Sequence, residues 1–528
     1  MGGKISSPVV SRSFFSSSTD KHPVPDPRLY TDGRWLHQDE LQRKVRYIEF
    51  DFPQLCKIAI SLCEAASEVT SYEKKEGGYN RVFILTMDTG KRIVVRIPTS
   101  VAGPRRLTTN SEVATIMYLQ SKTLLPLPKI LAWSDNPANP TGTEYIIQEH
   151  IEGIQLHEQW PTMDSVQHME CTKTLALIVR DMVKLDFPAY GNIYFSDAPI
   201  DEHLKLPLED GFCIGPYCSP LFWNCGPGEL ELYGKPSSNK GPWINLDNYA
   251  TGLIDTAFSR LPDECAASTD HLPFRGSVES HSRLLKICHK MMQALNRDER
   301  IQKAASPTLI HADYNKRNIY VSPDDSTIIT GIIDWQLTCI EPAFIYAQTT
   351  SDFAALPDID PSREVNEPKS KDEERLLKDI AICHRTYDVI LTYKTTKLRL
   401  GRELNSSLFR LFHYCYNTWQ NGIPTLRQDM IDLKAMWPEN IGECPYSPTE
   451  QELSEHAKQY EDFETRQKLK MWLKLSMDTT SDGWFPNELW ADAKKANRIA
   501  YDEWIQSARE FDDMTVEKAD SLWPFDAR

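Results

Sequence analysis

The most informative stretch of the sequence is LIHADYNKRNIYVSPDDSTIITGIIDW, residues 309–335. An apolar run ends at His311, Asp313 follows two residues later, and Asn318 lies five residues further on. A second apolar run ends at Asp334, and the Ser-Pro-Asp-Asp sequence between the two runs is a turn signal. This order predicts a β-hairpin whose two strands bring Asn318 and Asp334 together.

The residue types in this stretch suit phosphoryl transfer. Mg²⁺ prefers oxygen ligands and is usually held by one or two carboxylates together with substrate phosphates. Asn318 and Asp334 are therefore candidate metal ligands, and Asp313 is a candidate base that orients an attacking hydroxyl. The alternative is that these residues have no catalytic role, because a His-x-Asp pair also occurs by chance and an Asp at a strand end is often a turn residue. The elements upstream favour the catalytic interpretation.

A second hairpin is predicted upstream, because β-branched and aromatic runs at Val82–Thr86 and Ile93–Ile97 flank an Asp-Thr-Gly turn. The GGYN sequence before it makes Gly77, Gly78 and Asn80 candidates for the cofactor site, since glycine lets backbone amides approach phosphates without a side-chain clash. Alone this signal is weak, because a glycine pair before a strand is more often an ordinary turn.

Two charged residues follow this hairpin. Arg96 ends its second strand, and Glu112 lies at the start of a helix expected over Ser111–Leu119, with Asn110 or Ser111 as its N-cap. Arg96 is a candidate cation for nucleotide phosphates, and Glu112 is a candidate anion that positions it. Alternatively, Arg96 is a solvated strand end and Glu112 an acid favoured by the helix dipole.

The next strand is expected over Glu144–Ile151, where the backbone at Glu149 and His150 is a candidate for pairing with an adenine edge. Beyond it the pattern becomes mainly helical, with a helix expected over 164–185 and a Pro- and acid-rich linker over 356–372. The first part is therefore a small antiparallel sheet, and the second part is mostly helices.

The order of these elements resembles the aminoglycoside phosphotransferase family of kinase-like enzymes, over residues 70 to 350, with HADYNKRN and IIDW as the most specific pieces. FPAYGNIYF, FCIGPYC, GPWINLDNY and RLYTDGRWL further resemble a fungal branch that includes the "altered inheritance of mitochondria" proteins. The resemblance implies an α+β, bilobal protein-kinase-like fold, with a small antiparallel-sheet N-lobe that holds ATP and a large, mainly helical C-lobe. It also implies that Asp313 is the catalytic base, that Asn318 and Asp334 bind Mg²⁺, and that the acceptor is a hydroxyl of a small molecule.

One position departs from the family pattern. The residue that pairs with the phosphates is commonly Lys, whereas VVRIP places Arg96 there. Arg is always charged and grips phosphate bidentately, but its geometry differs from that of an ammonium group. This departure keeps open an alternative function, a catalytically idle kinase-like protein that binds nucleotide or acts as a scaffold. A protein kinase is disfavoured because no DFG, APE or activation segment follows Asp334.

Length and composition set the outer limits. The chain has 528 residues, 41% of them hydrophobic, which suits a large folded core. A formal charge of −16 argues against nucleic acid as a partner, and no stretch has the length and apolarity of a transmembrane segment. The oligomeric state is not readable. The expected parts are an N-terminal extension with a helix, 22–69; a nucleotide-binding N-lobe, 70–152; a C-lobe with the catalytic loop and metal site, 153–355; and a helical region that completes the C-lobe, 356–528.

The first residues, 1–21, contain Lys4, Arg12 and many serines but no acid before Asp20. This bias is typical of a mitochondrial transit segment. The Met-Gly start with Ser6 also fits a myristoylation signal, and an untargeted, cytoplasmic protein is the third possibility. Mitochondrial localisation is the prediction.

Overall fold

The computed structural model describes residues 26–209, 211–262, 272–357, 371–511 and 514–526. The transit-segment prediction lies outside these residues. Within them no helix is long and apolar enough to cross a membrane. The cysteines in this part of the chain are all free thiols.

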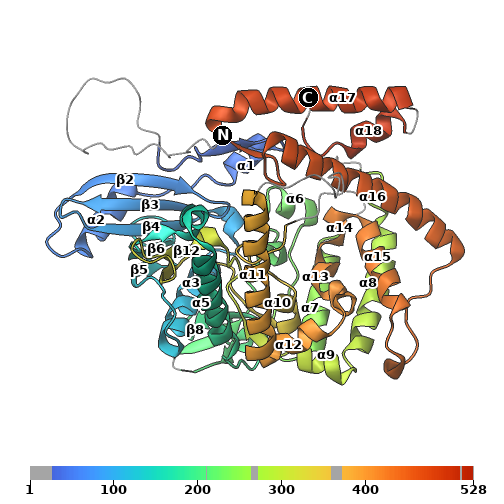
Figure 1. The fold of residues 1–528 in the computed structure, drawn as a ribbon, viewed down its shortest axis with the longest axis horizontal. Helices are drawn as coiled ribbons and strands as arrows, with labels where there is room; N and C mark the ends of the chain where they lie inside the picture. Colours follow the sequence, from blue (N-terminus) through green and yellow to red (C-terminus); the bar gives the residue numbers. More distant parts are fainter. Residues whose placement is uncertain (1–25, 210, 263–271, 358–370, 512–513, 527–528) are drawn as a thin grey trace.

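The N-lobe is built on a five-stranded antiparallel sheet in the order β2-β3-β4-β6-β5 (Figure 1). Alternate side chains of its central strands, such as Phe83, Leu85 and Val95, are buried and pack against helix α2. The bounds are α2 Phe52–Ser61, β2 Val69–Glu76, β3 Asn80–Met87, β4 Arg92–Pro98, α3 Leu107–Lys122, β5 Ile130–Ser134 and β6 Tyr145–Glu149.

Helix α3 begins four residues earlier than predicted and has Arg106, not Asn110 or Ser111, as its N-cap. The polar residues that suggested a cap are instead buried in tertiary hydrogen bonds. Asn110 Nδ2 donates to Asp135 at 3.0 Å, and Ser111 Oγ accepts a hydrogen bond from Asn192 Nδ2 at 3.1 Å. The predicted N-cap was therefore wrong, because long-range partners satisfy side chains that usually serve as local caps.

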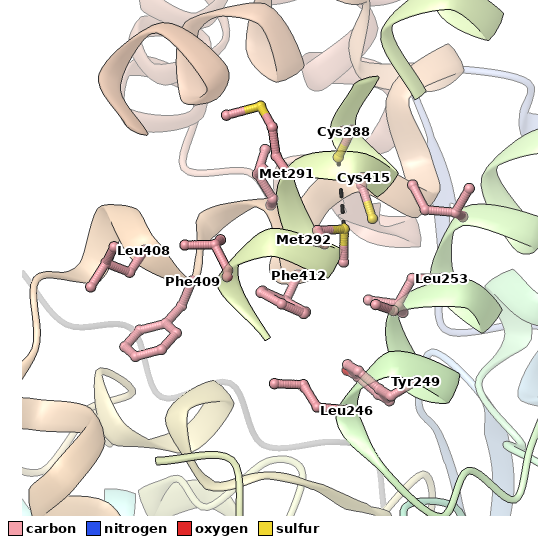
Figure 2. Close-up of a cluster of buried hydrophobic side chains, with 14 of the residues drawn as sticks. Leu246, Tyr249, Leu253, Cys288, Met291, Met292, Leu408, Phe409, Phe412 and Cys415 are labelled. Carbon is pink, nitrogen blue, oxygen red and sulfur yellow. Dashed lines mark hydrogen bonds between the residues drawn. The ribbon is translucent and has the colours of Figure 1, made fainter. Parts of the chain in front are cut away.

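The C-lobe is mainly helical and is threaded by short strands. Its largest core lies between α7 and α8, where Leu253, Cys288, Met292 and Phe412 meet (Figure 2). The bounds are β7 Ile154–Gln155, α4 Leu156–Gln159, α5 Ser165–Val183, β8 Asn192–Phe195, β9 Leu206–Pro207, β10 Phe212–Gly215, α6 Glu229–Tyr233, α7 Leu246–Ser259, α8 Val278–Leu295, α9 Glu299–Ala304, β11 Pro307–Leu309, β12 Ile319–Val321, β13 Ile329–Ile332, β14 Ile340–Pro342, α10 Ala343–Ala347, α11 Lys371–Lys394, α12 Thr396–Glu403, α13 Arg410–Tyr414, α14 Thr418–Asn421 and α15 Ile423–Ala435. The α+β class and the two-lobe architecture are confirmed.

The last helices lie beside the N-terminal extension, at the top of Figure 1. Strand β1 (Gly33–Trp35) pairs antiparallel with β15 (Trp484–Pro486), and Leu36 packs with Leu473 and Phe485 in a separate core. The other elements here are α1 Asp39–Lys44, α16 Glu450–Met477, α17 Trp490–Phe511 and α18 Val516–Leu522. The C-terminal region is thus shared: α11 to α15 pack on the C-lobe, whereas the end of α16, α17 and α18 form a clasp with residues 26–46.

Candidate active site

Asp313 lies on the loop between β11 and β12, and nearby backbone groups fix the loop. His311 is buried, and its Nε2 lies 2.8 Å from the Ile333 carbonyl oxygen. The Asp313 N–H donates to His311 Nδ1 at 3.0 Å, so the other nitrogen of the ring carries the proton. His311 therefore ties the loop to the strand that leads to Asp334 and keeps a single tautomer.

The Asp313 carboxylate is surrounded by hydrogen-bond donors. Asn315 Nδ2 donates to Oδ1 at 2.5 Å, while Asn318 Nδ2 at 2.9 Å and Arg317 Nη2 at 2.6 Å donate to Oδ2. Partial burial favours the neutral acid, but these donors outweigh it, Arg317 first, and hold the pKa of Asp313 below its usual value. Asp313 is thus an ionised carboxylate that can accept a hydrogen bond from a hydroxyl.

Asn318 lies just before β12 and Asp334 just after β13, and these two strands form one hairpin with the register Ile319↔Ile332. The side-chain amide nitrogen of Asn318 donates to Asp313. The side-chain carbonyl oxygen of Asn318 is therefore the atom that could bind a metal ion. Asp334 has a left-handed backbone with φ of 67°, an uncommon conformation for a non-glycine residue and one often found at functional sites. One carboxylate and one amide oxygen suit Mg²⁺, whose remaining ligands are phosphates and water.

Arg96 connects this hairpin to the N-lobe. Its Nη1 contacts Glu112 on α3, and its Nη2 lies 2.5 Å from Asp334 Oδ1. Burial acts against the charge of Arg96, but the two carboxylates more than offset it and raise the Arg96 pKa. Burial also raises the pKa of Glu112 to about 7, against the pull of Arg96. The cation expected for the phosphates is therefore shared between two acids in this structure.

A cavity of about 210 Å³ lies between the lobes beside these groups. Most of the residues expected in a nucleotide site line it: Gly77, Gly78, Asn80, Arg96, Glu149, His150, Asn318 and Asp334. Gln148 also lines it and is buried, and its Oε1 has no hydrogen-bond partner among the described residues. A buried acceptor without a donor is costly, so this atom suits a ligand that carries an N–H group.

Two segments of this cavity were predicted from the sequence to contact a nucleotide. They differ in whether their backbone groups are free to bind one. Gly78 lies in the β2–β3 turn, and a Cβ there would meet no atom within 4 Å, so the turn leaves open space. Asn80 Nδ2 donates to Gln336, which ties the turn to the loop after Asp334. The Glu149 N–H, by contrast, is donated to Lys129 at 3.0 Å, which leaves His150 as the better backbone partner for an adenine edge.

A second cavity, of about 440 Å³, opens on the other side of the catalytic loop. Asp313 and His311 form part of its wall, and Glu341 from β14 faces it. Burial raises the pKa of Glu341 to about 7, and the Tyr217 hydroxyl donates to its carboxylate. Aromatic side chains also line it, among them Phe222, Tyr249, Tyr346, Tyr387 and Tyr416.

Sequence reasoning missed Gln148, Gln336, Glu341 and Arg317. Arg317 alone carried a local signal, because it stands four residues after Asp313. The described residues contain no group of three or more His, Cys, Asp or Glu side chains that could hold a metal ion.

Residues 252–345 match the model of the phosphotransferase enzyme family. The chain is 32% identical over 301 residues to a subtelomeric hrmA-associated cluster protein of Aspergillus fumigatus, a match that covers 52% of this chain and 58% of that relative. It is 22% identical to the mitochondrial altered inheritance of mitochondria protein 9 of Clavispora lusitaniae, over 90% of this chain and 88% of the relative.

Among solved structures, the streptomycin–ATP complex of the aminoglycoside phosphotransferase APH(2″)-IIa aligns with a TM-score of 0.38 and 12% identity, over 74% of this chain and 98% of that one. The matched family segment itself contains Asp313, Asn318 and Asp334. Residues 252–345 of this chain are therefore similar to the phosphotransferase enzyme family.

Proposed function

We propose that this protein is an ATP- and Mg²⁺-dependent phosphotransferase that moves the γ-phosphoryl group to a hydroxyl of a small molecule. The observation that carries the proposal is the position of Asp313 and Asn318. They share a hydrogen bond of 2.9 Å, yet Asn318 lines the cavity between the lobes and Asp313 lines the other cavity. Donor and acceptor would thus meet at the catalytic loop.

The roles follow from these positions. Gly77, Gly78 and Asn80 cradle the phosphates, Arg96 positioned by Glu112 binds them, and the segment of Glu149 and His150 receives the adenine. Asn318 and Asp334 would hold Mg²⁺, which would offset the negative charge of the phosphates. Asp313 accepts the proton of the acceptor hydroxyl or orients it for in-line attack.

The acceptor occupies the second cavity, where Glu341 and the aromatic side chains contact it. The nucleotide-binding lobe corresponds to residues 70–152 and the catalytic lobe to 153–355, with helices α11 to α15 completing the latter. The proposed location is the mitochondrion, because relatives that align over most of the chain are named mitochondrial. Fractionation of cells that express a tagged full chain tests the location.

The function is tested by incubating the full chain with Mg²⁺ and γ-labelled ATP against a library of hydroxyl metabolites. A labelled product that disappears with Asp313→Ala supports the proposal. The second candidate, an idle nucleotide-binding protein, draws on the Arg96 contact with Asp334, which occupies a metal ligand. It predicts that Mg-ATP raises the melting temperature while no acceptor is labelled.

A further inference from the structure

Arg317 places a positive charge beside Asp313, the general base of the proposed reaction. Its guanidinium donates to Asp313 Oδ2 through Nη2 at 2.6 Å and through Nε at 3.2 Å. The side chain is 69% exposed, whereas that of Asp313 is 29% exposed. The charge is therefore held at the carboxylate from the open side of the loop.

The three donors to Asp313 are not equivalent. Asn318 is buried, and its amide nitrogen also donates to the Asp313 carbonyl oxygen at 2.9 Å. Asn315 is partly buried, and its carbonyl oxygen accepts from the Asp352 N–H at 3.1 Å. Arg317 is the exposed partner, so it is the one that a hydroxyl can replace on Oδ2 at the least cost.

Two other positively charged side chains near this site, Arg96 and Lys316, contact other groups. Arg96 is divided between Glu112 and Asp334. Lys316 lies 5.1 Å from the centre of the Trp160 ring and donates to the Asp352 carbonyl oxygen at 3.3 Å. Arg317, by contrast, donates to Asp313 itself, beside the place from which the acceptor hydroxyl attacks in the proposed reaction.

We propose that Arg317 is a catalytic residue that binds the phosphoryl group during its transfer, an inference that rests on the proposed function. The acceptor hydroxyl replaces the guanidinium on Asp313 Oδ2, and the freed guanidinium donates to an oxygen of the γ-phosphoryl. The acceptor oxygen forms the new O–P bond while its proton passes to Asp313. The bond from the γ-phosphorus to the bridging oxygen breaks, and its electron pair leaves with ADP.

The physical reason is charge. In the transition state of transfer, the phosphoryl group spreads negative charge over its oxygens. An Arg that stabilises this charge typically contributes about 10³- to 10⁵-fold to kcat. Arg suits the role because its planar fork binds phosphate oxygens bidentately.

The test uses the full chain with Mg-ADP and aluminium fluoride, which imitates the phosphoryl group in transfer and needs no known acceptor, because water takes the acceptor's place. Calorimetry gives the affinity for Mg-ADP with and without fluoride, and transition-state mimics typically bind at least about a hundredfold tighter than ground-state ligands. We expect Arg317→Ala to lose at least about tenfold of this gain while the Kd for Mg-ADP stays unchanged. Free guanidinium ion should restore part of the gain in this variant.

Arg300→Ala is the matched control, because Arg300 is 59% exposed and pairs with Asp298 at 2.6 Å, away from both cavities. It should keep the full gain. An equal gain in Arg317→Ala and the unaltered protein overturns the role of Arg317 and leaves the proposed function standing. Absence of Mg-ADP binding in the unaltered protein overturns the proposed function and this inference with it.

Discussion

Arg96 Nη2 lies 2.5 Å from Asp334 Oδ1, and the same guanidinium contacts Glu112. One side chain on β4 therefore links helix α3 to the end of the C-lobe hairpin. The Arg96 and Glu112 side chains are almost fully buried, so their charges depend on each other rather than on water.

Loss of Arg96 should destabilise the fold as well as the site. Arg96→Ala leaves Glu112 buried without its partner, a change that typically costs about 3–5 kcal/mol. Urea unfolding should show this loss, and Arg96→Met combined with Glu112→Gln should recover much of it. Arg92→Ala on the same strand is the control, since its pair with Glu73 is partly exposed and should contribute less than about 1 kcal/mol. A similar loss for Arg92→Ala and Arg96→Ala would contradict the buried-pair account.

Asp313→Asn should abolish phosphoryl transfer and leave nucleotide binding intact. The amide keeps the shape of the side chain but cannot accept a proton, so kcat should fall by at least about a hundredfold. Labelled ATP measures transfer, and calorimetry with a non-hydrolysable ATP analogue measures binding. Asp325→Asn, in the exposed turn between β12 and β13, should change neither. Normal turnover by Asp313→Asn would remove Asp313 from the mechanism.

The parts of the site that sequence predicts are those close together in the chain. Asp313, Asn318 and Asp334 lie within one loop and hairpin, so turn residues and strand periodicity already place them near one another. The contact of Arg96 with Asp334 spans 238 positions, and only the family resemblance suggested that the two residues share a site. The clasp of β1 with β15 joins segments about 450 residues apart, and no local pattern indicates it.

The same physics explains the error at the start of α3. Asn110 and Ser111 have the residue types of an N-cap, yet Asn110 binds Asp135, and Ser111 Oγ accepts a hydrogen bond from Asn192 at 3.1 Å. These partners lie 25 and 81 residues away, beyond the reach of a propensity argument. Glu112 consequently lies in the second turn of the helix, buried against Arg96, rather than in a solvated first turn.

Stability should fall as pH rises towards 7 because of Glu341. Burial raises its pKa to about 7 in the folded protein, whereas it titrates near 4.5 when unfolded. Between these two pKa values the folded state holds a proton that the unfolded state has lost. The stabilising effect of the protonated Glu341 is therefore complete below the unfolded pKa, and it is lost as pH rises through the folded pKa. Over this window Glu341 contributes a decline of at most about 3 kcal/mol.

Glu341→Gln isolates this contribution, because the amide stays neutral and still accepts a hydrogen bond from Tyr217. The unfolding free energy of the variant should decline less between pH 5 and 7, as measured by urea titration at each pH. Glu152→Gln, an exposed acid outside the second cavity, serves as the control and should keep the original slope. An unaltered slope in Glu341→Gln would show that Glu341 is already ionised in the folded protein.

The turn that we propose to cradle the phosphates should depend on Arg46, a residue of the N-terminal extension. The Arg46 Nε donates to the Gly78 carbonyl oxygen at 3.3 Å, and its guanidinium lies 4.5 Å from the centre of the Trp35 ring. Because a trans peptide directs C=O and the following N–H to opposite sides, this bond sets the direction of the Tyr79 N–H. The clasp between β1 and β15 therefore reaches the turn through Trp35 and Arg46.

Arg46→Ala should weaken ATP binding without a matching loss of kcat, because it frees the turn but leaves Asp313 untouched. We expect a rise in the KM for ATP of about tenfold to 150-fold, the equivalent of one lost hydrogen bond to a charged group. Arg43→Ala provides the control, since Arg43, with a side chain 39% exposed, pairs with Asp39 at 3.2 Å on the same segment. A fall in kcat with unchanged KM would instead place the effect of Arg46 on the catalytic loop.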